Sequence, residues 1–130
     1  MCYYAIMVRL IDHAAAVLVG LFGVAHVFVG RQAFFEPTER GVWFLSAGFL
    51  LITAALTNYA RARLQIVPTG VALAALGGSL SILVCGALLG LASADLLNQP
   101  QSLLLLALGA LLTLTSAVDL LRRTNGSKFR

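Results

Sequence analysis

The stretch from Leu64 to Ala94 reads LQIVPTGVALAALGGSLSILVCGALLGLASA and contains no Asp, Glu, Lys or Arg. A helix that crosses a lipid bilayer needs about 20 predominantly apolar residues and satisfies its backbone hydrogen bonds internally. The stretch exceeds this length, and Pro68 near its start is well tolerated in a first helical turn. It therefore predicts a membrane-spanning helix that begins next to Pro68.

Three further charge-free stretches, at 14–30, 41–60 and 96–118, approach or exceed the same length. Hydrophobic residues make up 60% of the chain and charged residues 11%, against about 45–50% and roughly 25% in soluble domains. Short polar connections make sequential helices antiparallel neighbours. We therefore predict an all-α fold, a four-helix antiparallel transmembrane bundle, as a single integral membrane domain over residues 1–130. Its helices should span about 10–30, 42–60, 69–97 and 101–121.

The basic residues are distributed unequally among the predicted loops. Short loops that are rich in Lys and Arg stay in the cytoplasm. One side would carry Arg9, Arg61, Arg63, Arg122, Arg123, Lys128 and Arg130, and the other only Arg31 and Arg40. We therefore expect a protein of the bacterial inner membrane with both termini and the loop around Arg61 in the cytoplasm.

The formal net charge of +4 does not predict a nucleic-acid partner. The basic residues lie at predicted helix ends, where membrane topology explains them, and no basic patch with a recognition element is visible. The expected partner is the lipid bilayer, whose anionic lipids contribute about 1 kcal/mol per basic residue near the surface. A homo-oligomer or a larger membrane complex stays open as a further partner.

Small residues recur at spacings of three, four or seven along the predicted helices. Lipid tails are as apolar as leucine, so helices in a membrane associate where small residues let their backbones approach. We predict helix-packing positions at Gly20, Gly23, Ser79, Gly86, Gly90, Gly109 and Thr113. The pattern does not decide whether these residues pack within one chain or between two copies.

His26 is the polar residue of greatest interest in the predicted helices. It lies about one helical turn inside Arg31, where ionisable groups are costly and often functional. Its candidate partners in a ligand or proton pathway are Glu36, Glu39 and Ser46. The structural alternative is a neutral histidine that forms a hydrogen bond across the bundle near the interface.

Asp12 is the second candidate for such a pathway. Its nearest basic residue in sequence is Arg9, three positions earlier, and Asp119 is similarly close to Arg122 and Arg123. Residues three or four apart are neighbours on a helix surface. We therefore expect both aspartates to lie at solvated helix ends.

No catalytic motif and no cofactor or metal site is predicted. There is no Ser-His-Asp or Cys-His set and no phosphate-binding glycine loop after a strand, so the residues do not favour an enzyme. His13 and His26 would lie roughly 140° apart around one helix, which disfavours two stacked haems. Cys2 and Cys85 should differ too much in depth to form a disulfide.

Asp12 lies in the first of four helices in a 130-residue chain, and this arrangement resembles the small multidrug resistance transporters. That family uses a membrane-embedded glutamate, whereas this chain has an aspartate close to Arg9. The segment GVWFLSAG at 41–48, together with His26, resembles small uncharacterised four-helix bacterial membrane proteins, over about half the chain. This second resemblance implies no activity.

These observations favour a structural or accessory membrane protein that binds a small apolar ligand or a larger membrane complex. The alternative is a small transporter that uses His26 or Asp12. A membrane enzyme or a haem protein is less favoured.

Overall fold

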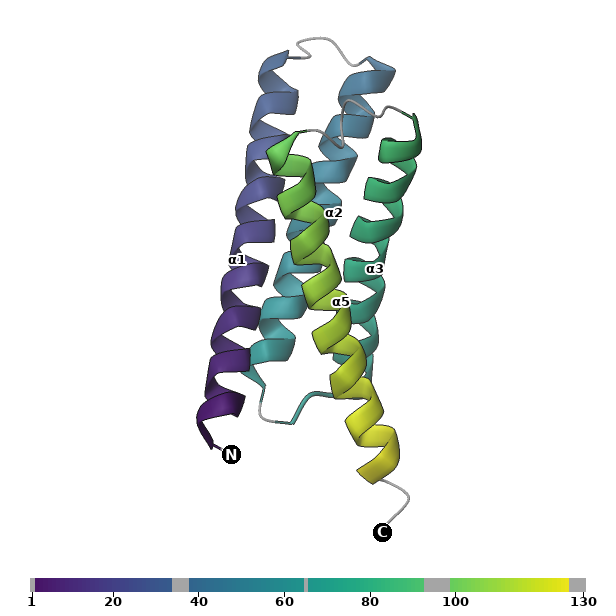
Figure 1. Cartoon of the computed structure of the whole chain (residues 1–130). Coiled ribbons are helices and arrows are strands. Elements are labelled where there is room, and N and C mark those ends of the chain that lie inside the picture. The colour runs from purple at the N-terminus through teal and green to yellow at the C-terminus, as the bar shows by residue number, and fades with distance from the viewer. Residues whose placement is uncertain (1, 34–37, 65, 93–98, 127–130) are drawn as a thin grey trace.

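The computed structural model describes residues 2–33, 38–64, 66–92 and 99–126. This part of the chain forms four long helices and no strand. In Figure 1 the helices lie side by side, and the first helix begins at the same end of the bundle at which the last helix ends. The helices are α1 (Cys2–Ala33), α2 (Glu39–Arg63), α3 (Thr69–Ala92) and α5 (Pro100–Gly126).

The all-helical prediction is confirmed, but α1, α2 and α5 are longer than predicted. A charged residue ends an apolar stretch without ending a helix, because the i to i−4 backbone bonds do not depend on side-chain polarity. At the start of α2, the Thr38 hydroxyl accepts a hydrogen bond from the Gly41 amide at 3.2 Å and caps the helix. The predicted end of the third helix, at residue 97, lies outside the described residues.

Each helix contains a segment long and apolar enough to cross a membrane. Length and apolar composition are the two properties by which these segments qualify as spans. The segments are Met7–Ala33, Arg40–Arg63, Thr69–Leu88 and Pro100–Arg122.

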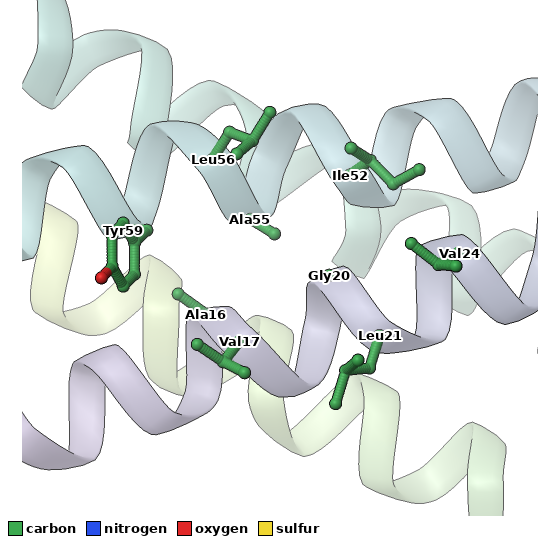
Figure 2. A pocket seen from close by; sticks show the side chains of 9 residues that line it. All are labelled: Ala16, Val17, Gly20, Leu21, Val24, Ile52, Ala55, Leu56 and Tyr59. Atoms are coloured by element: carbon green, nitrogen blue, oxygen red, sulfur yellow. The ribbon is translucent and has the colours of Figure 1, made fainter.

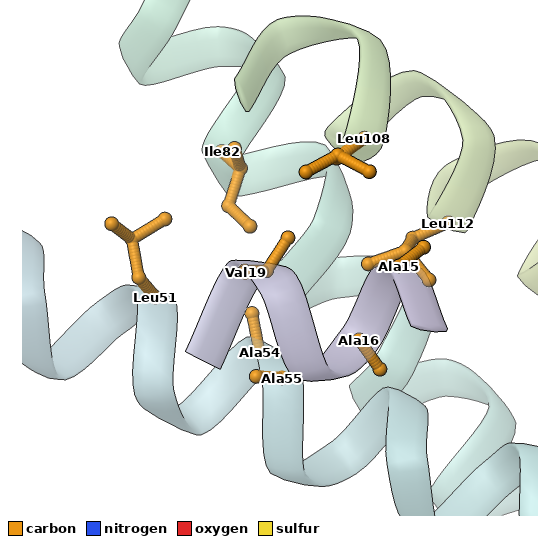
Figure 3. Close-up of a cluster of buried hydrophobic side chains, with 9 residues drawn as sticks. All are labelled: Ala15, Ala16, Val19, Leu51, Ala54, Ala55, Ile82, Leu108 and Leu112. Atoms are coloured by element: carbon orange, nitrogen blue, oxygen red, sulfur yellow. The ribbon is translucent and has the colours of Figure 1, made fainter. Parts of the chain in front are cut away.

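The core lies between all four helices and consists largely of small and aliphatic side chains (Figure 3). Helix α1 packs mainly against α2, α3 packs against α5, and smaller contacts join α2 to α3 and α1 to α5. Alanine predominates where α1 meets α2, which lets these two helices approach closely. The core residues are Ala15, Ala16, Val19, Leu51, Ala54, Ala55, Ile82, Leu108 and Leu112.

The closest approach between α1 and α2 lies at Gly23 and Gly48. A Cβ atom on Gly23 would lie 2.9 Å from the Gly48 carbonyl oxygen, and one on Gly48 would lie 3.0 Å from the Gly23 carbonyl oxygen. One turn away, a Cβ on Gly20 would lie 3.3 Å from the Cβ of Ala55. The two backbones are therefore in direct contact, and no larger side chain fits between them.

The other predicted packing residues lie on α3 and α5. Gly86 faces Leu106, and a Cβ on Gly109 would lie 3.1 Å from Ile82, so both glycines lie at the seam between these helices. The half-buried Thr113 donates its hydroxyl hydrogen to the Gly109 carbonyl at 2.8 Å. Gly90 is half-buried, and Ser79 is fully buried and belongs to the polar network described below.

Candidate functional site

Arg61, in the last turn of α2, is buried inside the bundle. Its side chain is 1% exposed, although its place near a helix end predicted a residue of the cytoplasmic loop. The two terminal nitrogens donate hydrogen bonds to carboxylates of two other helices, Nη2 to Asp12 of α1 and Nη1 to Asp119 of α5, each at 2.5 Å. One guanidinium therefore joins α1, α2 and α5.

Thr115 of α5 completes this group of charged side chains. Nη2 of Arg61 donates to the Thr115 hydroxyl oxygen at 2.9 Å, and the Thr115 hydroxyl donates to Oδ1 of Asp12 at 2.8 Å. Both carboxylate oxygens of Asp12 thus accept hydrogen bonds from other helices. We refer to Asp12, Arg61, Thr115 and Asp119 as the Arg61 cluster.

The Arg61 cluster contains two carboxylates and one guanidinium. Moving charged groups from water into a protein interior costs free energy. Their mutual attraction compensates this cost only when the geometry of the ion pair is good and the remaining hydrogen bonds are satisfied. The cluster meets this requirement except at Nε of Arg61, which is buried and has no hydrogen-bond partner among the described residues. The Asp119 side chain is 33% exposed, so it connects the cluster to the surface of the bundle.

A second buried network lies one turn away, around Asn58 of α2. The Asn58 amide donates to the Ser79 hydroxyl at 2.8 Å and to the carbonyls of Ala54 at 2.9 Å and Ala75 at 3.3 Å. Its oxygen accepts a hydrogen bond from the Ser116 hydroxyl at 3.1 Å. This Asn58 network (Asn58, Ser79 and Ser116) joins α2, α3 and α5, so the two polar groups together connect all four helices.

The expectation that Asp12 and Asp119 lie at solvated helix ends is wrong for Asp12, which is 4% exposed. Each aspartate pairs with Arg61 across the bundle. The sequence feature that could have indicated these buried polar contacts was the spacing of polar residues on α2 and α5. Asn58 and Arg61 are three positions apart, and Thr115 and Asp119 are four apart, so each pair lies on one helix face.

His26 lies near the C-terminal end of α1, away from the Arg61 cluster. Its ring stacks on Phe44 of α2, with centroids 4.3 Å apart and an interplanar angle of 9°. Ser46 does not bind it, because the Ser46 hydroxyl is exposed and donates to the Val42 carbonyl of its own helix. Glu36 and the side chain of Glu39 lie outside the described residues.

Aromatic and basic side chains meet at the opposite end of the α1–α2 pair, between the N-terminal half of α1 and the C-terminal end of α2. The His13 ring packs edge-on against Tyr59, with centroids 5.2 Å apart, and its Nδ1 donates to the Arg9 carbonyl at 2.7 Å. The guanidinium carbon of Arg63 lies 5.4 Å from the centre of the Tyr59 ring. This contact has the geometry of a cation–π interaction.

Tyr59 also forms one end of a groove along the outer side of the α1–α2 seam (Figure 2). The groove has a volume of about 350 Å³ and is lined by residues of both helices. These are Ala16, Val17, Gly20, Leu21, Val24, Ile52, Ala55, Leu56 and Tyr59. Apart from the Tyr59 hydroxyl, these side chains are apolar. We call this feature the α1–α2 groove.

Within the described residues, no group of three or more His, Cys, Asp or Glu side chains is placed to hold a metal ion. No protein-family model, curated protein or solved structure matches the chain.

Proposed function

We propose that the chain is an accessory or structural protein of the bacterial inner membrane. In this proposal it forms an antiparallel four-helix bundle with both termini in the cytoplasm, which puts the Arg61 cluster at the cytoplasmic end. The excess of basic residues near the chain ends and Arg63 supports this orientation. The four apolar helices support insertion into the membrane.

One observation favours a structural role over transport. Among the described residues, every buried side-chain nitrogen or oxygen except Nε of Arg61 has a hydrogen-bond partner within the protein. A carrier must leave polar groups available to a substrate, whereas these groups bind one another. Because lipid tails do not drive helices together, such interhelical bonds contribute to bundle stability together with close packing.

A small transporter is the second candidate, and the composition of the Arg61 cluster supports it. Two carboxylates share one guanidinium, so a proton or cation bound to Asp12 or Asp119 would compete with Arg61. Release of Arg61 would loosen α1 and α5 from α2. Partial exposure of Asp119 provides access to the cluster.

Purification in mild detergent and reconstitution into proteoliposomes distinguish the two candidates. The accessory role predicts a membrane protein that copurifies in fixed stoichiometry, no visible absorbance band, and ion or substrate flux equal to that of empty vesicles. Flux driven by a proton gradient that is lost in Asp12→Asn or His26→Ala, but kept in Arg122→Gln, would establish the transporter instead. Each variant must first elute as a monodisperse species, because Asp12→Asn weakens a buried ion pair.

A further inference from the structure

The α1–α2 groove has a floor and two rims and runs along the outer surface of the bundle. Its floor consists of the small residues Ala16, Gly20 and Ala55. Its rims are formed by the exposed side chains of Leu21 and Leu56. Figure 2 shows Tyr59 at one end of the groove and Val24 at the other. The groove extends over eight residue steps of α1, a rise of about 12 Å.

The two ends of the groove differ in chemistry. Beyond Tyr59 lie the guanidinium of Arg63, the imidazole of His13 and, one turn further along α1, the exposed Arg9. The opposite end, at Val24, is apolar. A ligand that fits this gradient has a long apolar chain attached to an anionic group.

In the proposed membrane orientation, a lipid fits the change from basic to apolar side chains along the groove. With the termini in the cytoplasm, Arg9 and Arg63 lie at the cytoplasmic headgroup level, and the groove runs from there into the hydrocarbon region. Anionic headgroups attract basic residues at this level. Arginine presents several N–H donors to phosphate oxygens in a planar fork.

A second copy of the chain fits the groove less well. A symmetric dimer brings the same patch of both subunits together. Two copies in the same membrane orientation would place Arg9 and Arg63 of one copy against the same residues of the other. Such juxtaposition of like charges opposes association.

We propose that the α1–α2 groove is a binding site for an anionic phospholipid of the cytoplasmic leaflet. One acyl chain lies in the groove over Gly20, and the phosphate is bound by Arg63 and Arg9. The proposal rests on the membrane insertion and orientation proposed above, and not on the choice between accessory protein and transporter.

Native mass spectrometry of the intact detergent-solubilised protein tests the site. The protein is titrated with phosphatidylglycerol or phosphatidylcholine that carry the same acyl chains. We expect tighter binding of phosphatidylglycerol, and the double variant Arg9→Gln/Arg63→Gln should lower its affinity roughly thirtyfold, by the contribution of two basic residues near a membrane surface. The matched control Arg122→Gln removes an exposed charge on α5 and should leave the affinity unchanged.

A second pair of variants tests the apolar part of the site. Val17→Phe narrows the groove and should weaken binding of both lipids, whereas Val84→Phe should not, because Val84 is on α3 and is equally exposed, at 48%. Equal affinity for the two lipids, or equal effects of a variant and its control, would overturn the proposal. A lipid-free dimer that Val17→Phe abolishes would assign the groove to a second copy. Resistance of the protein to alkaline extraction from membranes, measured in parallel, separates loss of the lipid site from failure of membrane insertion.

Discussion

Replacing Arg61 by methionine tests how much the Arg61 cluster contributes to the stability of the bundle. The substitution keeps an unbranched side chain of similar length and removes the guanidinium. Asp12 and Asp119 then lose their shared partner. Removal of one partner from a buried ion pair destabilises a protein by about 3–5 kcal/mol.

Exposure of the two aspartates determines where in this range the effect should lie. Asp119 is 33% exposed and regains water when Arg61 is removed, whereas Asp12 is almost fully buried and does not. We therefore expect about 3 kcal/mol, the lower end of the range. This corresponds to roughly a hundredfold change in the unfolding equilibrium.

Unfolding by sodium dodecyl sulfate in mixed micelles measures this change. Arg61→Met should unfold at a clearly lower denaturant fraction than the wild type, and Arg122→Met, which removes an exposed arginine of α5, should not. A double-mutant cycle with Asp12→Asn isolates the interaction between the two charges. Asp12→Asn should destabilise the wild type and should stabilise the Arg61→Met protein, because it removes an unpaired buried charge.

Two results would refute this reasoning. Equal stability of Arg61→Met and Arg122→Met would mean that the buried ion pairs do not hold the helices. An identical effect of Asp12→Asn in both backgrounds would mean that Asp12 and Arg61 are not coupled.

Two further substitutions test the rest of the interior in the same assay. Asn58→Leu should destabilise the bundle by about 1–3 kcal/mol, because it removes the central member of a buried hydrogen-bond network. The control is Thr53→Val, which changes an exposed hydroxyl bonded within its own helix. Equal effects of the two substitutions would contradict a stabilising role of the Asn58 network. Gly48→Leu should prevent close packing of α1 and α2 and abolish the monodisperse species in size-exclusion chromatography. Gly77→Leu is the control and should be tolerated, because a Cβ atom on Gly77 would meet nothing within 4 Å. An intact Gly48→Leu protein would contradict the close packing of α1 and α2.

The number and type of the helices could be predicted because apolar length is a local property of the sequence. The stretch from Leu64 to Ala94 needs no knowledge of its neighbours to predict a helix. Gly20 and Gly23 could likewise be selected, because small residues at helical spacing indicate close approach. Gly48 on the opposing helix was missed, although Gly41 and Ala55 each lie seven positions from it, because the residues three and four positions away are large: Phe44, Leu45, Leu51 and Ile52.

The partners of the charged side chains could not be predicted in this way. Sequence neighbours offered Arg9 for Asp12, but the observed partner, Arg61, is 49 positions away. The choice depends on how α1 and α2 are rotated about their axes, and a list of hydrophobic residues does not determine this rotation. Arg61 was assigned to a loop because an arginine beside an apolar stretch usually marks its solvated end.

The most direct test of the central claim is the side of the membrane on which each connection lies. Single cysteines introduced by Thr38→Cys, Ile66→Cys and Gln99→Cys, in a background with Cys2→Ser and Cys85→Ser, can be labelled with a membrane-impermeant maleimide in spheroplasts and in inverted vesicles. A four-span bundle with the Arg61 cluster at the cytoplasmic end predicts labelling of positions 38 and 99 in spheroplasts and of position 66 only in inverted vesicles. Labelling of position 66 from the same side as position 38 would contradict it.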